Sequence, residues 1–132
     1  MKSHAILSLL GRFALALIFI ITGWSKITGY AGTQQYMEAM GVPGALLPLV
    51  IALELGGGLA IAAGLFTRAI AVAMALFSVA TALIFHANLA DASQAINFWK
   101  NLSMAGGFLL LAANGAGALS IDARRSSSAQ AS

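Results

Sequence analysis

One acidic residue interrupts a long apolar stretch of this chain. Glu54 is the single charged residue between Ala39 and Thr67. A charged side chain at the centre of a membrane-spanning helix costs roughly 2.5–3.5 kcal/mol, so an ionisable residue there is a functional-site hypothesis by default. A carboxyl group in apolar surroundings can act as an acid or a base, and its charge needs a partner.

Four other polar residues are expected close to Glu54. Lys26 ends the first apolar stretch, and His86 lies near the end of the third. Lys100 and Asn101 open the fourth. If the four stretches cross a membrane in alternating directions, all of these ends face the same side. Ammonium groups, an imidazole and an amide beside a carboxyl group suit proton handling or the binding of an anionic or quinone-like oxygen, with Glu54 and His86 as candidate catalytic acid and base.

The same residues also suit a purely structural role. A Glu–Lys pair and amide hydrogen bonds can fix the register of a helix bundle without any ligand. No metal site is expected, because Glu54 and His86 supply too few ligands. The chain has no cysteine, which excludes iron–sulfur clusters, Cys-ligated zinc and thiol redox chemistry. The other histidine, His4, lies at the opposite membrane face, so a haem held by two histidines of one chain is not expected.

The elements that must position these side chains are membrane helices. Of the 132 residues, 60% are hydrophobic and only 8% are charged, against roughly 25% charged in a typical soluble domain. That leaves too little charged surface for a water-soluble fold, and it excludes intrinsic disorder. No basic stripe is interleaved with exposed aromatic residues, so no nucleic-acid partner is expected.

Four stretches are long enough to cross a bilayer as helices of about 20 residues, at about 5–27, 44–64, 67–88 and 98–118. Residues 1–121 are therefore predicted to form one all-α, integral-membrane four-helix bundle. Residues 122–132 are predicted to be a disordered cytoplasmic tail. In the first outer loop, residues 33–40 predict a short helix, and Gly41 is expected at its C-terminal cap.

The distribution of basic residues predicts the orientation of the bundle. Most lysines and arginines fall on one side, which predicts that both termini are cytoplasmic: Lys2, Arg12, Arg68, Arg124 and Arg125 against Lys26 and Lys100. Within the first span, Arg12 is interpreted as an anchor that reaches the lipid headgroups.

Small residues recur every fourth position in the second span. They predict the face on which a neighbouring helix packs closely, and they are Ala52, Gly56, Ala60 and Gly64.

Short motifs in a fixed order run through most of the chain: Arg12…Gly23-x-x-Lys26, Pro43…Glu54-x-Gly56-Gly57, Gly64-x-x-Thr67-Arg68, His86 and Trp99-Lys100-Asn101-Leu102-Ser103. From about residue 6 to 122 this pattern resembles the DoxX family of small bacterial inner-membrane proteins. The resemblance implies four transmembrane helices in the inner (plasma) membrane, with both ends inside. The family takes its name from a subunit of an archaeal quinol oxidase or thiosulfate:quinone oxidoreductase system, and some members are membrane partners of redox-defence enzymes. Its recurring polar positions correspond here to Lys26, Glu54, His86, Lys100 and Asn101.

The leading hypothesis is an accessory subunit of a quinone-linked membrane redox system. Its expected ligand-binding residues are Lys26, Glu54, His86, Lys100 and Asn101, which would bind a quinone non-covalently. No covalently bound cofactor is expected. The expected partners are the lipid bilayer and redox-enzyme subunits, and self-association into a homo-oligomer stays open. The alternative is a small-molecule permease or a non-enzymatic scaffold, and the sequence leaves open whether the chain is itself an enzyme.

Overall fold

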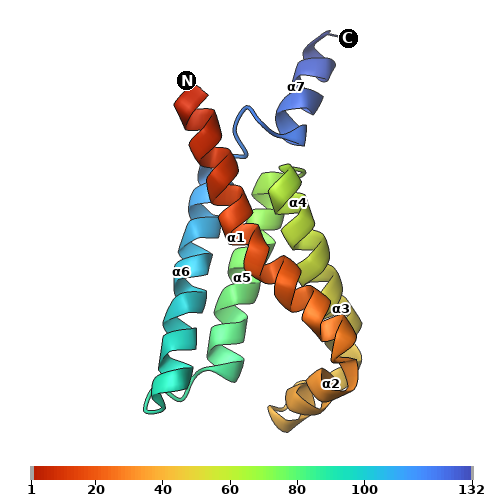
Figure 1. The fold of residues 1–132 in the computed structure, drawn as a ribbon, viewed down its shortest axis with the longest axis vertical. Coiled ribbons are helices and arrows are strands. Elements are labelled where there is room, and N and C mark those ends of the chain that lie inside the picture. The colour runs from red at the N-terminus through yellow and green to blue at the C-terminus, as the bar shows by residue number, and fades with distance from the viewer. Residues whose placement is uncertain (1, 132) are drawn as a thin grey trace.

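The chain folds into helices joined by short connections. The computed structural model describes residues 2–131, and within that range it contains helices and no strand, which confirms the all-α prediction. In chain order the segments are α1 (Lys2–Thr28), α2 (Tyr30–Ala39), the short 3-10 segment η1 (Gly44–Leu46), α3 (Leu47–Ile51), the π-helical turn η2 (Ala52–Gly56), α4 (Gly57–Ala63), α5 (Thr67–Phe85), α6 (Ala92–Asn114) and α7 (Ile121–Ala131). The start of α1 and the whole of α7 lie at one end, here called the terminal end, and α2 lies at the other, here called the α2 end (Figure 1).

Three helical stretches of the described chain are long and apolar enough to cross a membrane, namely Lys2–Thr28, Gly44–Ala63 and Thr67–Phe85. They match the first three predicted spans. Their outward faces carry leucines that are about two-thirds exposed, such as Leu49 and Leu76, as expected for lipid contact.

The fourth predicted span, residues 98–118, differs from the structure. Helix α6 begins earlier, at Ala92, because Asp91 caps it by accepting hydrogen bonds from the backbone N–H groups of Ser93 and Gln94. It ends at Asn114, where Gly115 takes a positive φ of 80°. Its first half mixes polar with apolar residues, and α6 is not among the three stretches apolar enough to span. A complete four-helix transmembrane bundle therefore stays a prediction.

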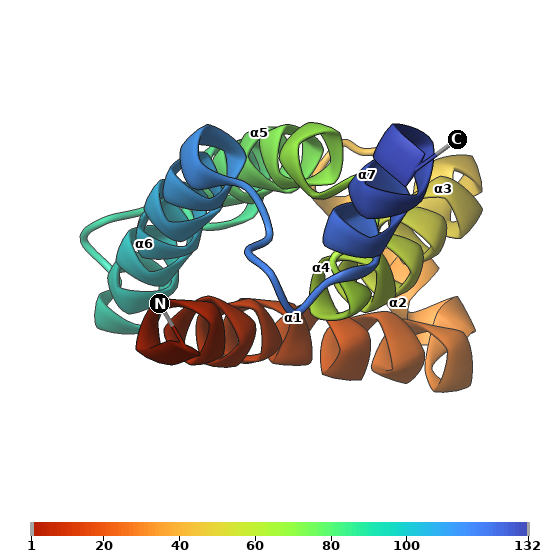
Figure 2. The ribbon, with the colours of Figure 1, turned by 90° about the horizontal axis from the view of Figure 1, so that it is seen from above.

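The long helices surround a small apolar core. Seen along the bundle, α1 and α5 lie on opposite sides, with α6 on one flank and α3–α4 on the other (Figure 2). The Phe19 ring meets the edges of Phe77 and Phe108, with ring centroids 6.4 Å and 5.5 Å apart. The other buried residues of this core are Ala16, Ile61, Ala71, Met74, Ala75 and Ala105.

The predicted packing face of the second span was wrong at Ala52 and Gly56, which are both exposed. A Cβ placed on Gly56 would meet open space. The buried glycines are instead Gly57 and Gly58. A Cβ on Gly58 would come within 3.3 Å of the Ala16 carbonyl oxygen of α1, and one on Gly57 within 2.7 Å of the Met74 sulfur. The π-helical turn η2 is wider than an α-helical turn, so the regular four-residue spacing does not run through it.

The short helix of the first loop is confirmed as α2, although it begins at Tyr30 rather than residue 33. Gly41 follows it with a positive φ of 81°, as expected for a helix cap. Met37 is buried and turns this helix toward the bundle.

The chain end is helical rather than disordered. Within the described residues, Ile121–Ala131 form α7. The Ser120 hydroxyl caps its start by accepting from the Ala123 N–H at 3.1 Å. The Asp122 N–H also donates to the Gly64 carbonyl at 2.9 Å. These contacts tie α7 to the end of α4.

Candidate functional site

Glu54 lies on the π-helical turn and is only 5% exposed. The Lys26 ammonium group at the end of α1 donates to both carboxylate oxygens, at 2.9 Å and 3.1 Å. The Thr22 hydroxyl donates to the same carboxylate at 3.3 Å. Thr22 and Lys26 are four residues apart and share one face of α1. The buried charge of Glu54 is therefore paired by a cation and a hydroxyl from one helix.

A polar cavity of about 220 Å³ surrounds this pair. Its lining comes from α1, η2, α5 with His86 directly after it, and α6. All of the residues predicted to converge contribute to it, and they are Lys26, Glu54, His86, Lys100 and Asn101. The structure thus brings together every predicted site residue, while their role in binding stays a prediction.

Three of these side chains differ from the Lys26–Glu54 pair. In residues 2–131, no hydrogen bond or ion pair joins the side chain of His86, Lys100 or Asn101 to another residue. An imidazole, an ammonium group and an amide therefore line the polar cavity without a side-chain bond to another residue of the described chain; Lys100 is exposed, and His86 and Asn101 are partly buried. A role limited to holding helices together accounts for the Lys26–Glu54 pair but not for the position of these three side chains around the same cavity.

Sequence reasoning missed three other polar residues of this cavity, Thr22, Thr81 and Asn97. Two of them follow helical spacing: Thr22 precedes Lys26 by four residues, and Asn97 precedes Asn101 by four. The same-face rule for helices could have found both.

A second space adjoins the polar cavity and is mostly apolar. This apolar chamber, of about 340 Å³, is lined from α1, α2, α3, η2 and α5. It shares five lining residues with the polar cavity, namely Lys26, Glu54, Phe77, Thr81 and His86. The charged pair and the imidazole therefore stand where the two spaces meet.

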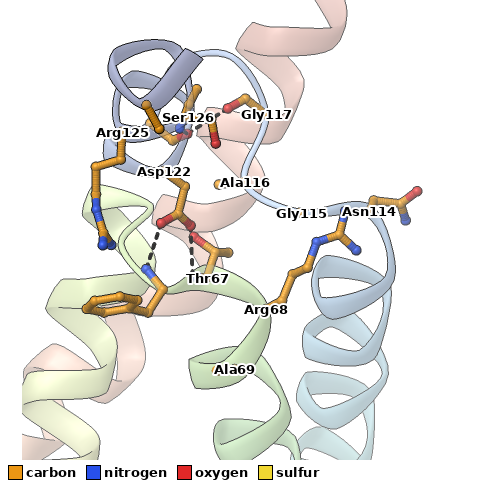
Figure 3. A pocket seen from close by; sticks show the side chains of 14 residues that line it. Thr67, Arg68, Ala69, Asn114, Gly115, Ala116, Gly117, Asp122, Arg125 and Ser126 are labelled. Carbon is orange, nitrogen blue, oxygen red and sulfur yellow. Dashed lines mark hydrogen bonds between the residues drawn. The ribbon is translucent and has the colours of Figure 1, made fainter. Parts of the chain in front are cut away.

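The terminal end holds a third space, of about 640 Å³, between α5, α6 and α7 (Figure 3). Its charged side chains form hydrogen bonds with backbone groups at the ends of helices. The Asp122 carboxylate accepts from the backbone N–H groups of Phe66 and Thr67, each at 2.8 Å, at the start of α5. Arg68 donates to the carbonyls of Ala112 and Ala113 near the end of α6.

The pKa of Asp122 lies below its usual value. Partial burial alone would raise this pKa, but hydrogen bonds from Thr67 and Phe66 and the charge of Arg125 favour the carboxylate and outweigh burial. The Arg125 guanidinium also lies 4.5 Å from the centre of the Phe66 ring. The charged Asp122 carboxylate thus links α7 to the start of α5.

The interpretation of Arg12 as a headgroup anchor was wrong. Arg12 is 1% exposed, and its guanidinium donates to the carbonyls of Ile61 and Ala62 at the end of α4, and to that of Leu119. The last carbonyls of a helix have no partner within the helix, and Arg12 supplies one from another segment. Its role is to join α1, α4 and the α6–α7 connection.

Metal binding has no support in the described residues, because residues 2–131 contain no group of three or more His, Asp or Glu side chains placed to hold a metal ion.

Comparison with known proteins gives relatives over most of the chain. The inner membrane protein YqjF of Escherichia coli (strain K12) is 59% identical over 114 residues, which cover 86% of this chain and 88% of YqjF. The inner membrane protein YphA of the same organism is 44% identical over 92% of both chains. The putative oxidoreductase CatD of Bacillus subtilis (strain 168) is 39% identical over 57% of this chain and 56% of CatD. No solved structure matches this chain significantly.

The DoxX family pattern matches residues 7–87. That range covers α1 to α5 and includes Lys26, Glu54 and His86. Together with the extent of the similarity to YqjF and YphA, the match shows that this chain belongs to the DoxX family.

Proposed function

We propose that this DoxX protein is an accessory subunit of a membrane redox system and that the polar groups of its cavity bind an oxygen atom of a quinone headgroup. Reduction of a quinone takes up electrons and protons in equal number. In this proposal the partner redox enzyme supplies the electrons. Glu54 and His86 exchange the protons, and Lys26 and Lys100 stabilise negative charge on the oxygen.

The observation that carries this proposal is the contrast within the cavity. Glu54 and Lys26 are paired, whereas His86, Lys100 and Asn101 line the same space without a bonded partner in the described chain. Polar groups that bond to no other residue, beside a paired carboxylate, suit the binding of a ligand oxygen. The name of one relative, putative oxidoreductase CatD, agrees with redox work.

The competing function is a permease or a scaffold. For a permease, the polar cavity would need to reach both membrane faces in turn. Phe19 and Phe77 of the apolar core line one side of the polar cavity, and this favours a cavity open at one end. A scaffold requires the Lys26–Glu54 pair but gives no reason for three further polar side chains to line the same cavity.

The orientation belongs to the same proposal. Both ends of the described chain lie at the terminal end (Figure 1), which also carries Arg68, Arg124 and Arg125. The excess of basic residues favours the cytoplasm for that end. The polar cavity then lies in the outer half of the inner membrane.

Native mass spectrometry of the protein extracted with its lipids tests the proposal. We expect the wild type to carry a quinone, and Glu54→Gln to lose it. Glu38→Gln is the matched control, because it makes the same chemical change on an exposed residue of α2. A wild type without any quinone, or a Glu54→Gln protein that retains it, would contradict the proposal.

A further inference from the structure

The apolar chamber has the size and lining of a binding site for a small aromatic molecule. Its volume of about 340 Å³ is at the lower end of the range of roughly 300–1,000 Å³ for small-molecule pockets. Apolar side chains from α2, the connection after it, α3 and α5 form most of its wall, and they are Met37, Val42, Val50, Ile84 and Phe85. Such a wall accommodates an uncharged ring rather than a polar or charged molecule.

One side of the apolar chamber offers hydrogen bonds. Lys26, Glu54 and His86 line it and also line the polar cavity, so they stand at the junction of the two spaces. The Lys26–Glu54 pair is held at 2.9 Å, and the imidazole of His86 has no bonded partner among residues 2–131. A ring in the apolar chamber could therefore direct one oxygen atom at these groups.

Two residues of α2 and α5 that line the apolar chamber are exposed. Tyr36 on α2 and Ile84 on α5 both line it, and they are 52% and 44% exposed. The Tyr36 ring stacks on Phe85 with centroids 5.5 Å apart and planes inclined by 22°. Gly29 and Gly41 flank α2. A ring that entered the apolar chamber between α2 and α5 would pass the Tyr36–Phe85 stack.

The π-helical turn is a further indication of a ligand site. Such turns are rare in proteins, and those that occur are often found at functional sites. Here the turn carries Glu54 at the junction of the two spaces.

We propose that the apolar chamber binds the ring of a small phenol or quinone, whose oxygen points to Lys26, Glu54 and His86, and that the ring enters between α2 and α5. The inference rests on the proposed quinone-linked function and adds the location of the ring and its entrance. The polar cavity beside it then holds the groups that exchange protons with the oxygen.

Single cysteines provide a direct test, because the natural chain has none. Val50→Cys places a thiol in the apolar chamber, and Val42→Cys is a second reporter should the first variant fold poorly. Asn97→Cys is the matched control, since Asn97 lines only the polar cavity. Each variant, reconstituted in lipid nanodiscs, is alkylated with N-ethylmaleimide in the presence of 2-naphthol or of naphthalene, which lacks the oxygen.

We expect 2-naphthol to protect positions 50 and 42 but not position 97. At ten times its dissociation constant, the probe leaves about a tenth of the sites free, so alkylation in the apolar chamber slows about tenfold. Equal protection by naphthalene overturns recognition of the oxygen. Protection of position 97 alone, or the absence of protection at positions 50 and 42, overturns the location of the ring. None of these failures removes a quinone from the wild-type mass spectrum, so they are distinguishable from failure of the proposed function.

Tyr36→Ala tests the entrance separately. Removing the ring that stacks on Phe85 opens the route, so we expect 2-naphthol to dissociate several-fold faster. Tyr30→Ala is the matched control, because it removes a tyrosine of α2 that does not line the apolar chamber. An unchanged dissociation rate for Tyr36→Ala contradicts entry between α2 and α5.

Discussion

Replacing Lys26 with methionine isolates the charged pair at the centre of the site. The substitution keeps the length and apolar stem of the side chain but removes the ammonium group. Glu54, which is 5% exposed, then retains only the Thr22 hydroxyl, 3.3 Å away. A carboxylate in this position must either remain charged without a cation or take up a proton, and both outcomes destabilise the folded protein at neutral pH.

The structure sets the expected magnitude. Removing one partner of a buried ion pair costs roughly 3–5 kcal/mol. The Lys26 side chain is 25% exposed and that of Glu54 is 6% exposed, so Lys26→Met should lie near the lower limit, at about 3 kcal/mol. Glu54→Gln should cost less, about 1 kcal/mol, because the remaining lysine can extend its ammonium group toward water. The double variant should cost about as little as Glu54→Gln alone, since it leaves no unpaired charge.

The assay is reversible unfolding of the purified protein in mixed micelles with increasing SDS, for the wild type, both single variants and the double variant. The double-mutant cycle should give a coupling free energy of about 2–3 kcal/mol. Lys100→Met is the control, because its exposed side chain pairs with no residue in the described chain, and its effect should stay within about 0.5 kcal/mol. Equal costs for the two single variants, or coupling near zero, would refute the argument that Lys26 neutralises a buried carboxylate.

Three further perturbations test other parts of the structure. Asp122→Asn should cost about 1 kcal/mol and speed hydrogen exchange in α7. Because the Asp122 pKa is lowered on folding, the protection of α7 from hydrogen exchange in the wild type should persist above pH 4. It should be lost as the pH falls through that lowered pKa. Gly23→Ala should cost about 1–3 kcal/mol, since its Cβ would lie 3.0 Å from the backbone of the π-helical turn, whereas Gly56→Ala meets open space and should be tolerated in the same unfolding assay. Arg12→Leu removes the donor from three carbonyls and should destabilise the fold by at least about 3 kcal/mol. Arg124→Leu, on an exposed residue, should change the unfolding midpoint little. Similar midpoints for the two variants would disprove that Arg12 joins α1, α4 and the α6–α7 connection.

The convergence of the polar residues could be predicted from the sequence. Glu54, Lys26, His86 and Lys100 lie at known distances from the ends of apolar stretches, and antiparallel helices bring alternate ends together. Hydrophobicity and length determine that arrangement almost alone. The pairing of Glu54 with Lys26 rather than with Lys100 depends on side-chain packing, and no periodicity encodes it.

The terminal end could not be predicted in the same way. Arg12 bonds to carbonyls about fifty and a hundred residues away along the chain, and Asp122 caps a helix that begins at Thr67. These are tertiary contacts between charged side chains and helix ends, so a local pattern leaves Arg12 as an anchor and residues 122–132 as a tail. The π-helical turn is similar. It inserts a wide turn at Glu54 that shifts the packed glycines from Gly56 to Gly57 and Gly58.

The measurement that tests the central claim most directly is a binding titration of a short-chain quinone against the protein in lipid nanodiscs. The wild type should bind it saturably at one site per chain. Glu54→Gln should weaken binding at least about tenfold, which corresponds to one lost charge-assisted contact of roughly 1.4 kcal/mol or more. Glu38→Gln should bind as the wild type does. Absence of saturable binding, or equal affinity in the wild type and Glu54→Gln, would contradict a quinone site built around Glu54.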